Sequence, residues 1–125
     1  MGKRATDSRE LGQWGEDLAK SALERMGWRI LDRNVRIGGG ELDIVALDGD
    51  ELVMVEVRVR RVGKLLPPAL SVGPRKLKSL VRAGSTYVSL LGWEKPWRID
   101  VFGITVDMND RWDIEHVKDV TAGRV

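Results

Sequence analysis

Two apolar stretches within residues 41–60, separated by a short acidic turn, constrain the fold of this chain more than any other feature. The stretches read ELDIVAL and LVMVEVRVR, and Asp48, Gly49, Asp50 and Glu51 lie between them. An Asp-Gly pair between β-branched runs is a strong signal for a β-hairpin, whose commonest loop has two residues. If Gly49 and Asp50 form that loop, the numbers of facing residues add up to 99. The sequence therefore predicts a two-stranded hairpin with a fixed register.

This register places charged residues opposite one another. Asp43 faces Glu56. Glu41 faces Arg58, and all four side chains share one face because strand side chains alternate. Opposed carboxylates about 5 Å apart repel by roughly 3 kcal/mol at an effective dielectric constant of about 20. A divalent cation, a shared proton or a contact with Arg58 would each offset this repulsion.

The opposed carboxylates predict a metal site that acts on phosphodiesters. Mg²⁺ takes one or two carboxylates and keeps its remaining positions for water and phosphate. Arg58 lies on the same face, where it would steady a phosphate. The alternative is a solvent-exposed sheet face with ordinary surface charges. Against that alternative, both strands carry apolar residues at both parities, which is typical of a sheet covered on both faces.

Length and composition predict one domain over residues 1–125. A chain of 125 residues with 42% hydrophobic residues fits one globular domain. No run reaches the roughly 18 apolar residues of a membrane span, and the N-terminal stretch lacks an apolar signal segment. We therefore expect a cytoplasmic protein without a membrane partner. The chain has no cysteine, so we expect any metal to be held by oxygen.

A basic segment follows the carboxylates. Residues 57–93 contain no acidic residue, although the net charge of the whole chain is only +2. Such clusters are typical of surfaces that follow phosphates, and the alternative is a solvated helix face beside a loop. The predicted nucleic-acid-binding residues are Arg60, Arg61, Lys64, Arg75, Lys76, Lys78 and Arg82. Lys76, in the first turn of a predicted helix, is also a candidate second cation at the carboxylate site.

Periodicity predicts the remaining elements. They are a helix over 7–26, a strand over 28–35, a helix from 74 to 92 and strands over 97–106 and 112–117. Strand 97–106 should run parallel to the strand before it, because a helix joins them. Glu16 lies at the margin of the first helix's apolar stripe, so it either faces the sheet or pairs with Lys20. His116 is predicted to be a surface residue.

Three consecutive glycines precede the hairpin. Gly38, Gly39 and Gly40 are followed neither by a lysine-serine pair nor by a helix, which argues against a phosphate-binding loop. They fit a hairpin loop that brings the backbone close to the site at residues 41–43.

The element order and five short motifs resemble one protein family. The motifs are GQWGE at 12–16, RN at 33–34, GGELD at 39–43, VEVR at 55–58 and RID at 98–100. In this order they resemble the YraN-like family of the PD-(D/E)xK nuclease superfamily, which is similar in fold to archaeal Holliday junction resolvases. The resemblance implies an α/β, restriction-endonuclease-like fold with three layers: a helix, a mixed sheet of four to five strands and a second helix.

The resemblance also implies metal-dependent cleavage of DNA, with selectivity for branched or flap structures. Asp43, Glu56 and the carbonyl of Val57 would bind Mg²⁺ or Mn²⁺, and Glu16 would orient the water held by the metal. Arg58 occupies the position of the superfamily's lysine. Arginine keeps its proton, since its pKa stays above about 12, and so cannot act as a general base. It can still stabilise the charge of the transition state.

Two other interpretations remain open. One is a DNA-binding module that keeps the fold without turnover, for which binding would depend steeply on salt. The other is a scaffold protein in which Arg58 bridges Asp43 and Glu56. Resolvases of this fold work as dimers, so a homodimer is a further expectation, although no residue marks a dimer surface.

Overall fold

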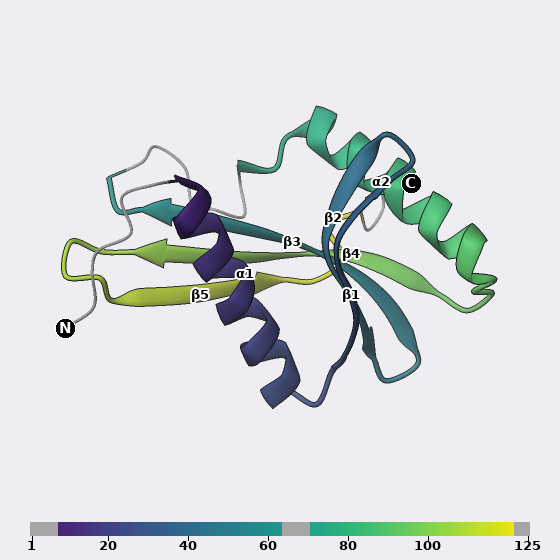
Figure 1. Cartoon of the computed structure of the whole chain (residues 1–125), viewed down its shortest axis with the longest axis horizontal. Helices are drawn as coiled ribbons and strands as arrows, with labels where there is room; N and C mark the ends of the chain where they lie inside the picture. The colour runs from purple at the N-terminus through teal and green to yellow at the C-terminus, as the bar shows by residue number, and fades with distance from the viewer. Residues whose placement is uncertain (1–7, 64–70, 122–125) are drawn as a thin grey trace.

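Two helices and five strands make up the part of the chain that the structure describes, residues 8–63 and 71–121. The structure is a computed structural model, shown in Figure 1. The elements are α1 (Ser8–Arg25), β1 (Arg29–Ile37), β2 (Gly40–Asp48), β3 (Glu51–Arg61), α2 (Pro74–Leu91), β4 (Trp97–Val106) and β5 (Trp112–Val117). Each predicted element is confirmed, with ends that differ by at most two residues. Neither helix is long and apolar enough to cross a membrane.

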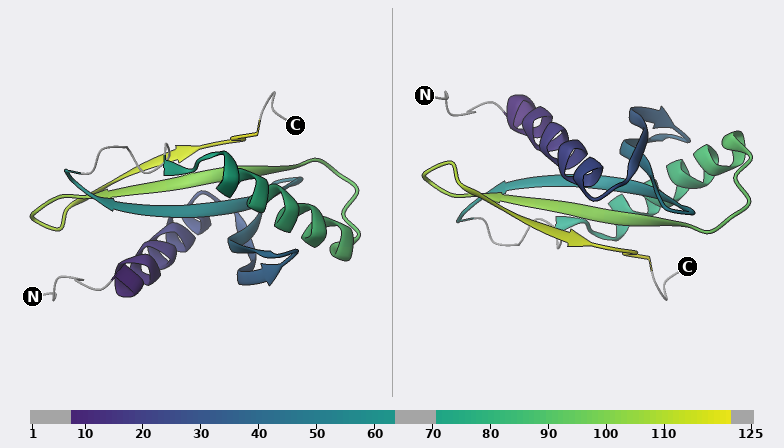
Figure 2. Two further views of the ribbon diagram at one scale, coloured as in Figure 1. Left: turned by 90° about the horizontal axis from the view of Figure 1, so that it is seen from above. Right: turned by 90° about the horizontal axis from the view of Figure 1, so that it is seen from below.

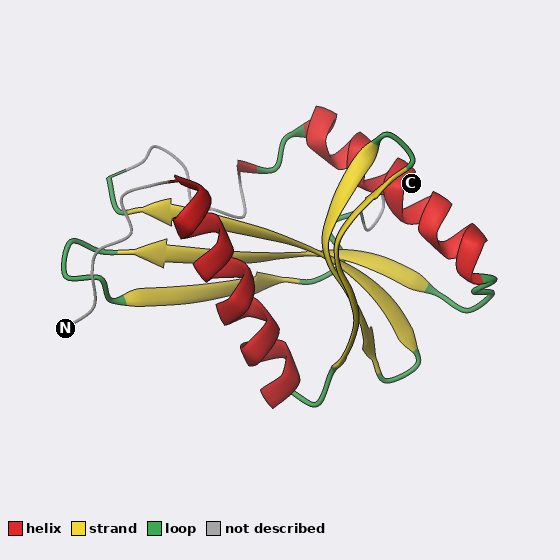
Figure 3. Cartoon of the chain, viewed as in Figure 1, coloured by secondary structure: helices red, strands yellow, loops and turns green. Residues whose placement is uncertain are grey.

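The strands form one mixed sheet in the order β1-β2-β3-β4-β5 (Figure 3). β4 runs parallel to β3, as predicted from the helix between them, and the other neighbours are antiparallel. Between β2 and β3 the pairs run from Asp48 with Glu51 to Ile44 with Val55. The predicted register is therefore confirmed over this stretch.

The helices cover opposite faces of the sheet. Val53 packs in one apolar cluster with Leu23 of α1, whereas the next residue, Met54, packs in another with Leu80 of α2. Successive strand residues point to opposite faces, so the two clusters lie on the two sides of β3. The predicted three-layer α/β architecture is confirmed.

β2 and β3 diverge beyond the pair of Ile44 with Val55. Their ladder ends there, although β2 begins at Gly40 and β3 continues to Arg61. Beyond this point β2 remains paired with β1, and β3 with β4. Figure 2 shows the β1–β2 hairpin twisting out of the plane of β3, β4 and β5. We call this divergence the fork, and Asp43 and Glu56 are the first residues beyond its last pair.

α1 approaches β3 closely at Gly15. A Cβ atom at this position would overlap with Cγ2 of Val59, so only glycine permits the contact. In a helix the next residue, Glu16, is therefore held close to the sheet. Gly15 thus explains how the first helix can bring a carboxylate to the fork.

Candidate functional site

Asp43 lies at the start of the fork, bound to the backbone of the neighbouring strand. Its Oδ2 accepts a hydrogen bond of 2.9 Å from the N–H of Val57. A side chain thus takes the place of the backbone partner that an unbroken ladder would provide. This bond holds the Asp43 carboxylate against β3.

Glu56 is the buried carboxylate of the fork. Its side chain is only 4% exposed, and its Oε2 lies 3.1 Å from Nε of Arg58 and 3.6 Å from Nζ of Lys76. Its Oε1 is buried without a hydrogen-bond partner among the described residues. Burial and then repulsion by Asp43 raise the pKa of Glu56 to about 8, although Lys76 and Arg58 act in the opposite direction. The two cations therefore offset only part of the cost of this buried carboxylate.

Glu16 of α1 faces the same acidic region. Burial and then the charge of Asp43 raise the pKa of Glu16 above its ordinary value. Its Oε1 is also buried without a hydrogen-bond partner in the described part of the chain, and its side chain is 17% exposed. Lys20 pairs with Glu24 at 3.1 Å. The prediction that Glu16 faces the sheet is thus confirmed, and the Lys20 alternative is wrong.

Arg33 and Asn34 of β1 hold Glu16 from the side, a role that the sequence did not reveal. Nη2 of Arg33 lies 3.9 Å from Oε1 of Glu16 and 2.8 Å from Oδ1 of Asp17. Arg33 and a side-chain hydrogen bond from Asn34 both lower the pKa of Glu16, against the larger effects of burial and Asp43. Asn34 has a φ of 53°, a left-handed conformation that asparagine tolerates better than most residues. The sequence signal that could have indicated this role is the asparagine at position 34, within a predicted strand.

The donor set at the fork fits a hard divalent cation. Asp43 and Glu56 supply carboxylate oxygens, and one oxygen of Glu56 has no partner among the described residues. Across residues 8–63 and 71–121, no group of three or more His, Cys, Asp or Glu side chains is arranged to hold a metal ion. A metal held here would have two side-chain ligands and take its others from backbone, water or phosphate, which suits Mg²⁺ or Mn²⁺.

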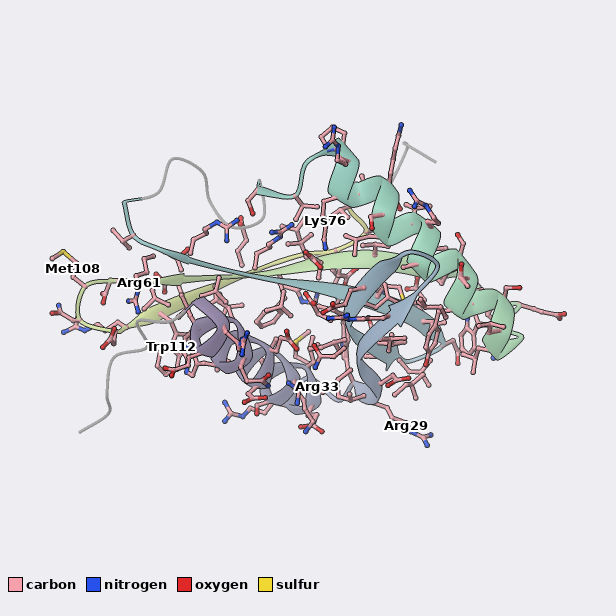
Figure 4. All side chains as sticks on the ribbon, turned by 45° about the horizontal axis from the view of Figure 1, so that its top comes forward. Arg29, Arg33, Arg61, Lys76, Met108 and Trp112 are labelled. Carbon is pink, nitrogen blue, oxygen red and sulfur yellow. The ribbon has the colours of Figure 1, made fainter. Side chains whose placement is uncertain are left out.

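The structure brings two of the predicted cations to the fork. Arg58 of β3 and Lys76 of α2 both contact Glu56, and Lys76 extends from the beginning of α2 toward β3 in Figure 4. The predicted pairing of Glu41 with Arg58 is wrong, because the β2–β3 ladder ends at Ile44 and Val55. Glu41 instead lies 3.6 Å from Arg36, because β2 stays with β1 beyond the fork.

The other predicted nucleic-acid-binding residues are spread over a wider surface. Arg61 lies near the β4–β5 turn in Figure 4, where its Nη1 is 3.6 Å from Asp110. Nη1 of Arg60 donates to the Val59 carbonyl at 2.9 Å. Lys64 lies outside the described residues. The remaining three, Arg75, Lys78 and Arg82, are exposed on α2.

A second charged cluster lies at the opposite end of the same hairpin. Arg98 of β4 is 8% exposed and donates hydrogen bonds of 2.8 Å to both Asp48 and Glu51. Its Nε donates to Asp100 at 2.9 Å. Asp48 and Glu51 are directly opposed in the ladder, so Arg98 neutralises a like-charged pair.

Asp100 is fully buried and hydrogen-bonded on both oxygens. Burial alone would raise its pKa, but hydrogen bonds from His116 and Arg98 and from the N–H of Asp119 lower the pKa below the usual range. His116 donates from Nε2 at 2.8 Å and is 13% exposed, so the prediction of a surface histidine is wrong. We call Asp48, Glu51, Arg98, Asp100 and His116 the Arg98 network.

Known proteins are similar in sequence to most of this chain. Residues 15–104 match the family described as Uncharacterised protein family UPF0102. A UPF0102 protein of Marinobacter nauticus is 44% identical over 112 residues, which cover 89% of this chain and 91% of the relative. The chain belongs to the UPF0102 family. A UPF0102 protein of Geobacter sulfurreducens is 42% identical over 118 residues, which cover 94% of this chain and 92% of that relative.

Membership of the UPF0102 family confirms the predicted YraN-like family. The stretch that matches UPF0102 contains the fork residues and the Arg98–Asp100 pair, but it ends at residue 104, before His116. The UPF0102 match therefore covers both charged clusters, apart from the β5 side of the Arg98 network.

Proposed function

We propose that this UPF0102 protein is a metal-dependent endonuclease that hydrolyses phosphodiester bonds in DNA, with selectivity for branched or flap structures. One observation carries the proposal. A buried carboxylate, Glu56, lies with Asp43 where two strands separate, and it keeps an oxygen without a partner among the described residues. If these carboxylates served only to stabilise the fold, a cation should neutralise them, as Arg98 neutralises Asp48 and Glu51.

The two carboxylates would hold one Mg²⁺ or Mn²⁺. A third ligand would come from the backbone, because the N–H and C=O of one strand residue point to the same side and the N–H of Val57 points to Asp43. When bound, such an ion polarises a phosphodiester and lowers the pKa of water. A proton on Glu56, favoured by its raised pKa, has to leave before its carboxylate binds a cation.

Glu16 would orient the attacking water. Its Oε1 is buried 3.9 Å from Nη2 of Arg33 and has no hydrogen-bond partner among the described residues, so it can accept a hydrogen bond. Gly15 and Arg33 fix its position from two sides. The water would then attack the phosphorus and lose a proton to solvent, while the bond to one sugar oxygen breaks and that oxygen takes up a proton.

Arg58 and Lys76 would together replace the single lysine of the superfamily. Arg58 stays charged, so its guanidinium would hold a phosphate oxygen and stabilise the transition state. Lys76 supplies the amine that β3 lacks, with Nζ 3.6 Å from Glu56. Lysine can release a proton where arginine cannot. The exposed cations of α2, Arg75, Lys78 and Arg82, would hold the DNA backbone.

A cleavage assay tests the proposal. Labelled four-way junction, flap, single-stranded and duplex DNA are incubated with the protein in Mg²⁺, Mn²⁺ or EDTA, beside an Asp43→Asn/Glu56→Gln double variant. The matched control is Asp50→Asn, which removes a carboxylate from the exposed hairpin turn. Metal-dependent cleavage by the wild type and the control that is lost in the double variant would support the proposal. Cleavage retained in the double variant would overturn it.

One residue favours a second candidate function. Arg58 stands where the superfamily has its lysine and cannot serve as a general base. If the wild type binds DNA with a steep salt dependence and cleaves none of the four substrates, the protein is a nucleic-acid-binding module with this fold.

A further inference from the structure

A pocket of about 600 Å³ opens between the β1–β2 turn and the first turns of α2. The end of the β1–β2 hairpin contributes residues 36–41, which include the carboxylate Glu41, and α2 contributes Lys76 and Ser79. The residues assigned above to water and metal line the fork and not this pocket. The pocket therefore needs an explanation of its own.

The glycines let the β1–β2 turn lie directly against α2. A Cβ atom at Gly40 would lie 2.8 Å from Oγ of Ser79, and one at Gly38 would lie 2.6 Å from Oγ1 of Thr86. Gly38 and Gly39 also have positive φ values, 59° and 77°, which favour glycine. The close approach expected from the three glycines is thus toward α2, and it leaves bare backbone on one wall of the pocket.

Two cations, Arg36 and Lys76, and one carboxylate, Glu41, line the pocket, so the charge of its lining is net positive. Arg36 is 88% exposed and touches Glu41 only at 3.6 Å, so its guanidinium can turn toward a ligand at little cost. Nη1 of Arg82 lies 3.6 Å from the position of a Cβ atom at Gly39. The residues that line the pocket include no aromatic ring on which a base would stack. This chemistry favours a phosphate over a nucleobase.

Lys76 connects the pocket to the fork. It lines the pocket, and its Nζ lies 3.6 Å from Oε2 of Glu56. A nucleic-acid strand whose phosphate lies at the fork would therefore pass the pocket with a neighbouring part of its backbone.

We infer that this pocket binds a backbone phosphate of the DNA strand, next to the phosphate at the fork, with Arg36 and Lys76 as its cations. The inference rests on the proposed function for its ligand. It adds a subsite that fixes the position of the strand, formed by the glycine turn and α2.

Direct binding tests the subsite without cleavage. The affinities of the wild type, Arg36→Glu and Arg29→Glu for the four DNA structures are measured by fluorescence anisotropy in EDTA. Arg29 is an exposed arginine of the same strand and lies away from Lys76 in Figure 4, so it controls for net charge. We expect Arg36→Glu to bind roughly tenfold more weakly than Arg29→Glu, with a salt slope smaller by about one.

Single methylphosphonate substitutions then locate the contact. Each neutralises one phosphate of the best-bound DNA, and one position should weaken binding by the wild type but not by Arg36→Ala. Coupling at one position without any cleavage would support the subsite and overturn the hydrolysis. Cleavage by the wild type with no position coupled to Arg36 would overturn the subsite and leave the hydrolysis standing. A wild type that binds none of the DNAs, or an Arg36→Glu variant that binds as Arg29→Glu does, would also overturn the subsite.

Discussion

The β2–β3 hairpin carries two pairs of neighbouring carboxylates, one opposed in the ladder and one just beyond its end, and their surroundings differ. Asp48 and Glu51 share Arg98, which donates a 2.8 Å hydrogen bond to each. At the fork, Oε2 of Glu56 contacts two cations, whereas Oε1 has no hydrogen-bond partner among the described residues. The same hairpin therefore holds one neutralised pair and one that is left incomplete.

The pKa values follow this difference. Hydrogen bonds lower the pKa of Asp100 in spite of its complete burial, whereas burial and Asp43 raise the pKa of Glu56 to about 8. A buried carboxylate is tolerated when donors replace its water, and it costs stability when they do not. The Arg98 network therefore stabilises the fold, whereas the buried carboxylate at the fork lowers its stability.

Replacing Arg98 should give the largest effect. Arg98→Met leaves Asp100 and the pair of Asp48 and Glu51 without their cation, and we expect a loss of about 3–5 kcal/mol in the free energy of unfolding. The matched change at the fork, Arg58→Met, should cost less than about 1 kcal/mol, because Glu56 can take up a proton instead. Urea denaturation at pH 7 measures both. Equal losses of unfolding free energy in the two variants would contradict the proposed difference between the Arg98 network and the fork.

Isosteric amides should change stability in opposite directions. Folding raises the pKa of Glu56, so the folded state keeps a proton that the unfolded chain has released between about pH 4.5 and 8. Wild-type stability falls as the pH rises through that window, and Glu56→Gln should avoid this loss. At pH 9 we expect Glu56→Gln to be roughly 2–4 kcal/mol more stable than the wild type, and at pH 4 about equal.

Asp100→Asn should show the reverse. Folding lowers the pKa of Asp100, so the carboxylate stabilises the fold above its ordinary pKa of 3.8 and loses this effect as the pH falls further. We expect Asp100→Asn to be less stable than the wild type by roughly 2–3 kcal/mol at pH 7. Thermal melts between pH 4 and pH 9 measure the stability of both variants.

If Glu56→Gln were less stable than the wild type at pH 9, the fork would be a structural network.

Alanine substitutions at two glycines of α1 distinguish the effect of helix–sheet contact from the effect of helix propensity. Gly15→Ala would overlap with Val59 and push α1 from β3, at a net cost of about 1–2 kcal/mol, and it should reduce cleavage by displacing Glu16. Gly12 has no atom within 4 Å of its would-be Cβ, so Gly12→Ala should stabilise the helix by up to about 1 kcal/mol. Melting temperatures and cleavage rates are compared at matched folded fractions. Unchanged cleavage in Gly15→Ala would remove Glu16 from the reaction.

Lys76→Met should have the smallest effect on stability. Lys76 is partly exposed and contacts Glu56 at 3.6 Å, so its loss should change the unfolding free energy by less than about 1 kcal/mol. Cleavage should nevertheless fall, because Lys76 supplies the amine at the fork. Lys78→Met, an exposed neighbour on α2, is the control and should cleave much faster than Lys76→Met. Similar rates for the two variants would place Lys76 among the ordinary DNA contacts.

Local sequence signals predicted most of the fold. The Asp-Gly turn and the apolar runs set the register that pairs Asp48 with Glu51. Helical periodicity put Glu16 at the margin of the apolar stripe and left open whether it faces the sheet, as it does, or pairs with Lys20. The same register arithmetic put Asp43 across from Glu56, and the charge of Asp43 does raise the pKa of Glu56. These features depend on neighbours along the chain or across one turn, which a sequence displays directly.

The features that the sequence did not predict share one cause, because they depend on how distant strands pack together. The register pairs Glu41 with Arg58, but β2 leaves β3 at Asp43, so Glu41 contacts Arg36 instead. Nothing near His116 in the sequence shows that it binds the buried Asp100 across β4 and β5. Sheet divergence and tertiary hydrogen bonds arise from packing of the whole molecule, and no local periodicity encodes them.

A Mn²⁺ titration tests directly whether the fork binds a metal ion. Isothermal calorimetry at pH 8 compares the wild type with Asp43→Asn, which changes the incomplete pair, and with Asp48→Asn, which changes the neutralised one. We expect the wild type and Asp48→Asn to bind Mn²⁺ with similar affinity and Asp43→Asn to bind at least about tenfold more weakly. Equal binding by all three proteins, or none by the wild type, would contradict a metal site at the fork.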